Sequence, residues 1–307
     1  MLRFITARLL QAVLVLLTTI TITFFLIRMA PGSPFMEERN YTPETIARLN
    51  KHYGFDQPLH IQYFRYLGRA VRGDLGPSTT YANRTVNDVI AEAFPESLEL
   101  GFYALLLAFL VGTGAGVAAS LRPNSARDYG VMGFAMTGIC LPSFVLGPVL
   151  ILIFAVGLGW LQPSGWHLPS DRILPTITLA SAYIAYIARL TRGSMLETWP
   201  QDYIRTARAK GLSELRVTLR HALRNAILPI VSFLGPAAAG LITGSFVVET
   251  IFHIPGLGRQ FVQSAFNRDY SLVLGLVAFY AAIIVIFNTA VDIALSVLDP
   301  RIRRRAA

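Results

Sequence analysis

The sequence has few charged residues and almost no cysteine. Charged residues make up 15% of its 307 positions, against about 25% in an average soluble domain. Hydrophobic residues account for 53%, and the mean hydropathy is +0.51. This balance excludes an ordinary soluble protein and indicates an integral membrane protein. The single cysteine, Cys140, lies in an apolar run, so an internal disulfide is excluded.

Residue patterns typical of catalysis, nucleotide binding and metal binding are also missing. The glycine-rich run 112–116 has no preceding strand and no following P-loop lysine, so it indicates close helix packing. Gly240 and Gly244 have the same small-xxx-small spacing. Ser143 lacks a base at a suitable spacing, and no histidine has ligand spacing with another ligating residue. We therefore expect no enzyme, no metal site and no cofactor held by this chain.

The net charge of +9 comes almost entirely from arginine, because Lys51 and Lys210 are the only lysines. The arginines cluster beside apolar stretches. Membrane topology explains that distribution better than nucleic-acid binding does.

Six stretches are long and apolar enough to cross a bilayer, which takes about 20 residues. The third contains Pro142 and Pro148, so we expect a kink or break there. The first follows Arg3 and Arg8, as in a signal peptide, but it has spanning length and no cleavage pattern, so we expect it to be retained. The expected spans are residues 9–27, 98–121, 131–156, 173–188, 226–248 and 271–291.

The distribution of basic residues predicts the orientation. With the N-terminus in the cytoplasm, the inner segments hold sixteen lysines and arginines and the short outer loops hold three. Long loops escape this rule, so the first outer loop is not counted. We expect both termini in the cytoplasm.

The first outer loop, residues 29–97, has the composition of a folded segment. It is rich in aromatic residues, and helical patterns begin at Pro43 and Pro58, where proline suits a first helical turn. We expect helices at 43–53 and 58–71 and a small folded cap. The expected organisation is an N-terminal segment with the first span (1–28), the loop (29–97) and a transmembrane core (98–307) with a cytoplasmic loop at 189–226.

A basic segment, residues 202–229, separates the fourth and fifth spans. Gly211 is a natural helix terminator, and Ser213 can cap a second helix that leads into the fifth span. The segment either lies on anionic headgroups or docks into a cytosolic partner, and spacing leaves both interpretations open. In the second helix we expect an apolar stripe of Leu215, Leu219, Ala222, Leu223 and Ala226 beside a basic stripe of Arg216, Arg220 and Arg224.

Motifs along the whole chain resemble those of the membrane subunits of bacterial ABC importers for peptides, the dipeptide, oligopeptide and nickel permease group. The inner-face motifs are Arg-Leu-Thr-Arg-Gly-Ser-Met at 189–195 and Arg-Thr-Ala-Arg-Ala-Lys-Gly-Leu at 205–212. The segment 32–35 and the modest length favour the oligopeptide branch, and within it the first membrane subunit. The other matching stretches are residues 30–35, 73–78, 141–144, 249–252, 255–258, 267–270 and 299–303.

This resemblance implies an all-α type I ABC importer domain with six transmembrane helices, which moves peptides, with oligopeptides favoured, into a bacterial cell. It implies a different second permease subunit, two cytosolic ATPases that bind ATP and magnesium, and an extracytoplasmic substrate-binding protein, all at the inner membrane. Hydrolysis then belongs to the partner subunits.

By the same resemblance, residues 202–229 form the EAA-type coupling loop. Arg205, Thr206 and Ala207 stand in place of Glu-Ala-Ala, and fifteen residues instead of nine separate Gly211 from Ile227. Docking against the ATPase would require small residues, so we expect Gly211→Asp to uncouple ATP hydrolysis from uptake. The expected ATPase contacts are Arg205, Thr206, Ala207, Arg208, Ala209, Lys210, Gly211, Leu212, Leu228 and Pro229.

A candidate outer mouth of the pathway is formed by Glu249 and the turn residues Pro255, Gly256 and Gly258. The blander interpretation, which we favour, is that Glu249 is an interface carboxylate satisfied by water or Arg259. A secondary transporter is the rival class of protein. It would show ionisable residues in the middle of its spans, which this sequence does not.

Overall fold

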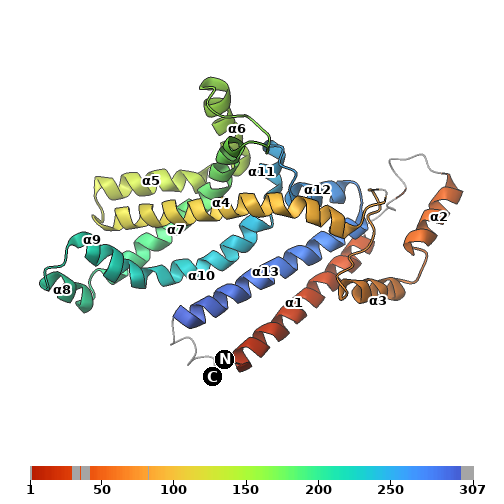
Figure 1. The fold of residues 1–307 in the computed structure, drawn as a ribbon, viewed down its shortest axis with the longest axis horizontal. Coiled ribbons are helices and arrows are strands. Elements are labelled where there is room, and N and C mark those ends of the chain that lie inside the picture. The colour runs from red at the N-terminus through yellow and green to blue at the C-terminus, as the bar shows by residue number, and fades with distance from the viewer. Residues whose placement is uncertain (1, 30–34, 36–41, 82, 299–307) are drawn as a thin grey trace. The chain divides into compact units, whose positions relative to one another are not determined.

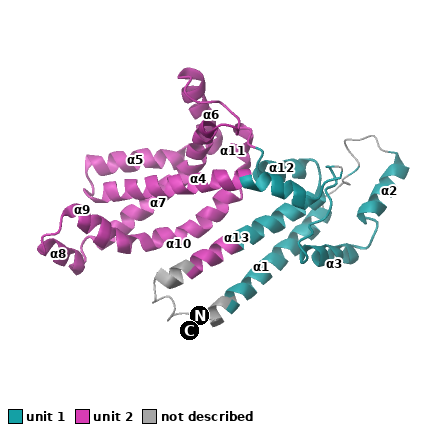
Figure 2. Cartoon of the chain, viewed as in Figure 1, with its two compact units in different colours: residues 1–95, 255–285 teal, residues 96–254, 286–307 magenta. Residues whose placement is uncertain are grey.

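The computed structural model describes residues 2–29, 35, 42–81 and 83–298 (Figure 1). Within those residues the regular elements are all helices, apart from one isolated bridge between Pro77 and Thr85. The chain divides into two compact units, Met1–Pro95 with Pro255–Val285 and Glu96–Ile254 with Ile286–Ala307 (Figure 2). Helices α4 (Val86–Ser120) and α13 (Tyr270–Leu298) contribute to both units.

The first unit confirms both helices predicted for the long loop. Thr42 caps α2 by accepting a hydrogen bond from the Thr45 amide at 3.4 Å. Gly54 ends α2 in the left-handed conformation, with φ +73°. The helices that lie wholly within this unit are α1 (Leu2–Met29), α2 (Pro43–Tyr53), α3 (Leu59–Ala70) and α12 (Leu257–Phe266).

The core of the first unit lies where the start of α4 packs against α12 and the start of α13. Aliphatic side chains fill it, so the segment that leads into α4 is fixed by apolar burial. The buried residues are Val86, Val89, Ile90, Ala93, Leu257, Leu272 and Leu276.

The second unit is a set of closely packed helices. A Cβ atom at Gly116 would lie 2.5 Å from Thr191 Cβ, and one at Gly112 would lie 2.9 Å from Ile187 Cβ. The small residues of α4 therefore let it approach α7 closely, as their spacing predicts. The helices of this unit are α5 (Ala126–Cys140), α6 (Ser143–Leu150), α7 (Ile173–Thr198), α8 (Asp202–Ala209), α9 (Glu214–Arg216), α10 (Leu223–Ile242) and α11 (Phe246–Ile251).

The third predicted span is broken, as its prolines predict. Helices α5 and α6, the latter continued by a π-helical turn at Ile151–Gly157, meet at an angle of 108°. Pro142 causes the break, because the residue before a proline avoids the helical region and Leu141 is extended (φ −98°, ψ 112°). Pro148 lies inside α6 without ending it. The described residues thus contain five helices that could span a membrane, or six if the bent pair is one span.

The fifth predicted span has different limits from those expected at 226–248. Its helix runs without a gap from α9 through a π-helical segment at Val217–Ala222 to the end of α10. Gly244 follows in the left-handed conformation (φ +86°), so its expected role in helix packing was wrong. Gly240 does lie in a tight position, because a Cβ there would be 2.8 Å from the Tyr183 hydroxyl.

Candidate coupling surface

The basic segment after the fourth span forms a helical hairpin at the end of α7. Helix α8 is followed by Gly211 in the left-handed conformation (φ +75°), and α9 begins after Ser213 (Figure 1). Ser213 has the extended conformation of an N-cap residue, although its hydroxyl makes no capping bond with a described amide. The predicted order of helix, glycine turn and helix is confirmed.

The hairpin packs on the second unit by a small apolar core. Ile204 and Ala207 point inward from α8, one helical turn apart, and are buried. They meet Met195 of α7 together with the buried side of the next helix. The other buried members of this core are Val217, Ala222 and Ala226. The segment is therefore held in place by its own chain before any partner binds.

An ion pair closes the hairpin across the glycine turn. Arg208 donates two hydrogen bonds to the Glu214 carboxylate, from Nε at 2.9 Å and from Nη2 at 3.2 Å. The guanidinium also lies 5.2 Å from the centre of the Trp199 ring. The pair is largely exposed, so it contributes less than about 1 kcal/mol to stability. Its bidentate geometry orients the two side chains across the glycine turn.

The predicted apolar stripe of the second helix was partly wrong. Leu215 and Leu219 are 71% and 53% exposed, whereas Val217 is fully buried beside Ala222. The π-helical turn explains the difference for Leu219, because its hydrogen bonds join residues five apart and the inward face shifts, whereas Leu215 lies before this turn. Val217 and Ala222, five apart, therefore share the inward face. The predicted basic stripe is exposed, as expected, at Arg216, Arg220 and Arg224.

These contacts leave a solvent-facing surface that we call the coupling surface. It combines two apolar side chains with two cations and the small residues of the turn, a mixture suited to a complementary groove on another protein. It consists of Arg205, Thr206, Ala209, Lys210, Gly211, Leu215 and Leu219.

The remaining predicted contact residues lie elsewhere. Ala207 is buried in the hairpin core, and Leu212 is half-buried beside it. Arg208 is exposed but is engaged by Glu214. Leu228 and Pro229 lie in α10, roughly 20 Å along the helix axis from the glycine turn. The structure therefore does not bring these two residues to the coupling surface.

A buried ion pair that sequence reasoning missed fixes the helix that leads to the hairpin. Asp128 of α5 is 1% exposed and accepts two hydrogen bonds from Arg192 of α7, at 2.7 and 2.6 Å. It also accepts the Asn124 amide at 2.8 Å. Ser125 and Asp128 match the spacing of a helix capping box, a signal that could have marked the aspartate but not its partner 64 residues away.

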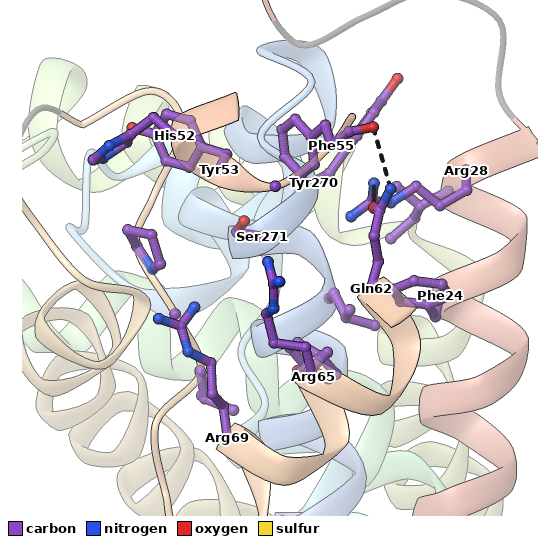
Figure 3. Close-up of a pocket in the computed structure, with 17 residues that line it drawn as sticks. Phe24, Arg28, His52, Tyr53, Phe55, Gln62, Arg65, Arg69, Tyr270 and Ser271 are labelled. Carbon is purple, nitrogen blue, oxygen red and sulfur yellow. Dashed lines mark hydrogen bonds between the residues drawn. The ribbon is translucent and has the colours of Figure 1, made fainter. Parts of the chain in front are cut away.

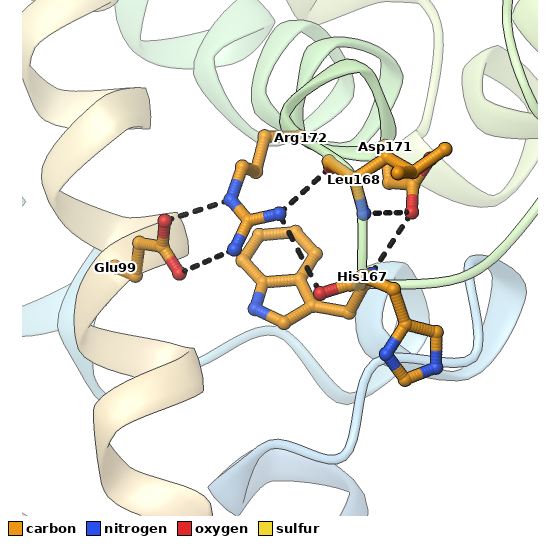
Figure 4. Close-up of polar contacts among 6 residues, drawn as sticks. Glu99, His167, Leu168, Asp171 and Arg172 are labelled. Carbon is orange, nitrogen blue, oxygen red and sulfur yellow. Dashed lines mark hydrogen bonds and ion pairs between the residues drawn. The ribbon is translucent and has the colours of Figure 1, made fainter.

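A second ion pair lies at the opposite end of α7. Arg172 donates to the Glu99 carboxylate of α4 at 2.7 and 3.2 Å and lies 4.9 Å from the centre of the Trp166 ring (Figure 4). Asp171 accepts the amides of His167 and Leu168 at 2.9 and 2.8 Å, which orders the connection before α7. Both ends of α7 are therefore tied to neighbouring helices.

The residues of the candidate outer mouth are largely enclosed. Glu249 of α11 has no exposed surface and accepts a hydrogen bond from the Ser97 hydroxyl at 2.9 Å. The preferred interpretation, an interface carboxylate satisfied by water or Arg259, did not include this buried hydroxyl partner. Pro255 is exposed, while Gly256 and Gly258 are buried at the start of α12. Among the described residues there is no cluster of three or more His, Cys, Asp or Glu that could hold a metal ion.

Two family models match nearly the whole chain. The model described as binding-protein-dependent transport system inner membrane component matches residues 108–304, and the model for the N-terminal part of such membrane components matches residues 1–101. The oligopeptide transport system permease protein OppB of Haemophilus influenzae is 50% identical over 305 residues, which cover 99% of this chain and 100% of that protein. The dipeptide transport system permease protein DppB of Bacillus subtilis is 45% identical over 288 residues, 94% of each chain.

Solved structures share the fold at lower identity. A chain of the MetNI methionine ABC transporter in an inward-facing conformation has a TM-score of 0.55 at 19% identity, over 69% of this chain and 96% of that one. A chain of an amino acid ABC transporter has a TM-score of 0.52 at 19% identity, over 67% and 92%. The expected all-helical membrane fold is confirmed.

Proposed function

Because the chain belongs to the family of binding-protein-dependent transport system inner membrane components, we propose that it forms one half of the membrane path of an ATP-driven importer for oligopeptides. The observation that carries this proposal is the identity of 50% to oligopeptide permease proteins over almost the full length. The chain contributes the path, and ATP hydrolysis resides in partner subunits.

In this proposal the chain is one of several subunits in a bacterial inner membrane. A different second permease completes the path, two cytosolic ATPases hold ATP and magnesium, and an extracytoplasmic binding protein delivers the peptide. Both termini and the arginine-rich hairpin face the cytoplasm, an orientation supported by the excess of basic residues on that side.

The coupling surface is, in this proposal, the contact with an ATPase. The Arg208–Glu214 pair and the apolar core make the hairpin a rigid body. Its second helix continues without a gap into α10, so a displacement of the hairpin moves the fifth span with it. Nucleotide binding would then shift the importer between inward-open and outward-open states through its different affinity for each.

Site-directed crosslinking tests this contact. Cys140 is exposed and is first replaced by serine, and a new cysteine is placed at Ala209 on the coupling surface. We expect Ala209→Cys to crosslink to an ATPase subunit in a nucleotide-dependent way. The matched control, Ala207→Cys, lies in the same helix but is buried and should crosslink far less.

The cargo is tested by uptake in the intact complex. We expect oligopeptides to stimulate ATP turnover and to enter more efficiently than dipeptides. Uptake that persists without ATP but depends on the proton gradient would contradict the proposal. Efficient crosslinking from Ala207→Cys but not Ala209→Cys would contradict the assignment of the surface and leave the transport function standing.

A further inference from the structure

The first unit encloses a cavity of about 380 Å³ whose lining is rich in arginine (Figure 3). It lies between the end of α1, the helices α2 and α3, and the start of α13. The side chains of Arg65 and Arg69 extend into it from α3, and Arg28 reaches it from α1 (Figure 3). Phenylalanine, tyrosine and aliphatic side chains also line it, so these cations lie in a partly apolar setting.

Two of the three guanidinium groups have amides as partners. Arg28 donates to the Gln62 side-chain carbonyl and lies 4.6 Å from the centre of the Phe55 ring. Arg65 donates to the Gln57 side-chain carbonyl. Within the described ranges, neither arginine has a carboxylate at ion-pair distance. The amide partners satisfy hydrogen bonds, and among the described residues neither positive charge is balanced by a carboxylate.

The third arginine and a tyrosine complete the polar lining. Arg69 is paired with Asp74, with 3.4 Å between Nε and Oδ2, so the cavity keeps a net positive charge. The Tyr66 hydroxyl is buried and has no hydrogen-bond partner among the described atoms. Burial raises the pKa of this hydroxyl, so it stays protonated and remains a donor. An anionic group with several oxygen acceptors would satisfy these donors.

Helix α3 is attached to α1 below the cavity. The Tyr63 and Thr21 hydroxyls are hydrogen bonded at 2.7 Å, and the Tyr63 ring stacks on Phe25 with 5.7 Å between ring centres. Thr21 lies seven residues before Arg28 in the span, which is about 10 Å along the helix. Helix α3 therefore contacts the apolar part of a candidate membrane span.

Helix α3 also has the two faces of an interfacial helix. Ile61, Phe64 and Val71 lie at positions that share one face and are 42%, 67% and 87% exposed. The residues that line the cavity occupy the neighbouring face. In the adjacent span α1, 6% of the most apolar window is buried, so most of its apolar side chains are at least partly exposed. Acyl chains can therefore lie beside both helices while a headgroup reaches the arginines.

We propose that this cavity binds the phosphate of an anionic phospholipid, held by Arg28, Arg65 and the Tyr66 hydroxyl. Its acyl chains lie along the exposed apolar residues of α1 and α3. With the orientation proposed above, this lipid belongs to the outer leaflet. The lipid anchors the folded outer segment to the membrane.

The test is a lipid titration of the purified transporter complex in phosphatidylcholine nanodiscs. Phosphatidylglycerol is the anionic probe, and its affinity is measured by native mass spectrometry. Arg65→Gln should weaken it about tenfold, the value of one charge-assisted hydrogen bond. Tyr66→Phe should weaken it by a smaller factor. Arg72→Gln, which removes an exposed charge outside the cavity, should leave the affinity unchanged.

Several outcomes would overturn the proposal. Equal losses for Arg65→Gln and Arg72→Gln would show a diffuse charge effect. Equal affinity for phosphatidylcholine and phosphatidylglycerol would show that the lipid charge is not recognised. Displacement of phosphatidylglycerol by excess inorganic phosphate would assign the cavity to a free anion. Because Arg65 is exposed on one side, its variant should fold, and unchanged thermal unfolding of the complex checks this.

Discussion

The two arginine-rich regions of the chain use their charges differently. At the inner hairpin and the helix that leads to it, Arg208 and Arg192 are paired with carboxylates in bidentate geometry. In the outer cavity, Arg28 and Arg65 are paired with amides. A carboxylate partner neutralises the charge of the guanidinium and holds the two side chains in one geometry. An amide partner positions the guanidinium without neutralising it.

This contrast matches the two proposed roles. The hairpin has to keep its shape while a partner pushes on it, so internal ion pairs suit it. The cavity has to attract an anion, and of its three arginines Arg69 is paired with the Asp74 carboxylate while Arg28 and Arg65 have amide partners. Variants that exchange one kind of partner for the other therefore test both roles.

The largest expected effect follows from removing the buried carboxylate beside α7. Asp128→Asn leaves Arg192 without its anion, and we expect a loss of about 2–3 kcal/mol in the free energy of unfolding. The measurement is thermal or denaturant unfolding in nanodiscs. Asp202→Asn is the control, because its ion pair with Arg205 at 3.6 Å is almost fully exposed, and it should have no measurable effect. Equal stability of both variants would show that the buried pair does not hold α7.

The next effect concerns the glycine turn. A Cβ at Gly211 would meet no described atom within 4 Å, so the structure itself leaves room for a side chain. If a partner packs there, Gly211→Asp should lower peptide uptake about tenfold or more while ATP hydrolysis continues. The readouts are uptake and ATP turnover in proteoliposomes.

Gly211→Asn separates packing from backbone conformation. Asparagine tolerates the left-handed region, in which Gly211 has φ +75°, better than other residues do. We expect the asparagine variant to be stable yet to lose uptake, because its side chain still projects toward the partner. Wild-type uptake in Gly211→Asn together with a loss in Gly211→Ala would show that the glycine serves only the turn.

Local signals in the sequence predicted much of the fold. The bounds of α2, the break after Leu141 and the glycine turn at 211 depend on a proline, a glycine or a cap within a few residues. The exposure of Leu219 could not be predicted, because a π-helical turn has no clear sequence signal and changes which residues face inward.

Long-range pairs were equally inaccessible from the sequence. Glu249 is enclosed with Ser97, which lies 152 residues earlier, and Asp128 pairs with Arg192 across 64 residues. The outer cavity depends on four helices that come together only in the fold. The sequence alone showed where the arginines lie along the chain. Their carboxylate and amide partners, on which the proposed roles depend, became visible only with the structure.

A smaller effect is expected from weakening the Arg208–Glu214 ion pair, which we call the hairpin clamp. Glu214→Gln replaces the carboxylate that holds Arg208 with an amide. Arg208 then has the same kind of partner as Arg28 and Arg65 in the cavity. We expect a two- to threefold lower ratio of transported peptide to hydrolysed ATP, within the range of a partly exposed ion pair. Glu197→Gln removes a nearby exposed carboxylate outside the clamp and should leave this ratio unchanged. Identical ratios in both variants would mean that the clamp does not shape the coupling surface.

The smallest effect comes from the reverse exchange in the outer cavity. Gln57→Glu gives Arg65 a carboxylate partner, so the guanidinium is neutralised before a lipid arrives. We expect the affinity for phosphatidylglycerol to fall about two- to fivefold, since an exposed ion pair contributes up to about 1 kcal/mol. Gln57→Ala removes the amide without adding a charge, and affinity should be kept or slightly raised. If both variants weaken binding equally, the amide of Gln57 serves to position Arg65 and the charge of the partner does not matter. The proposed difference between carboxylate partners at the hairpin and amide partners in the cavity would then have no functional meaning.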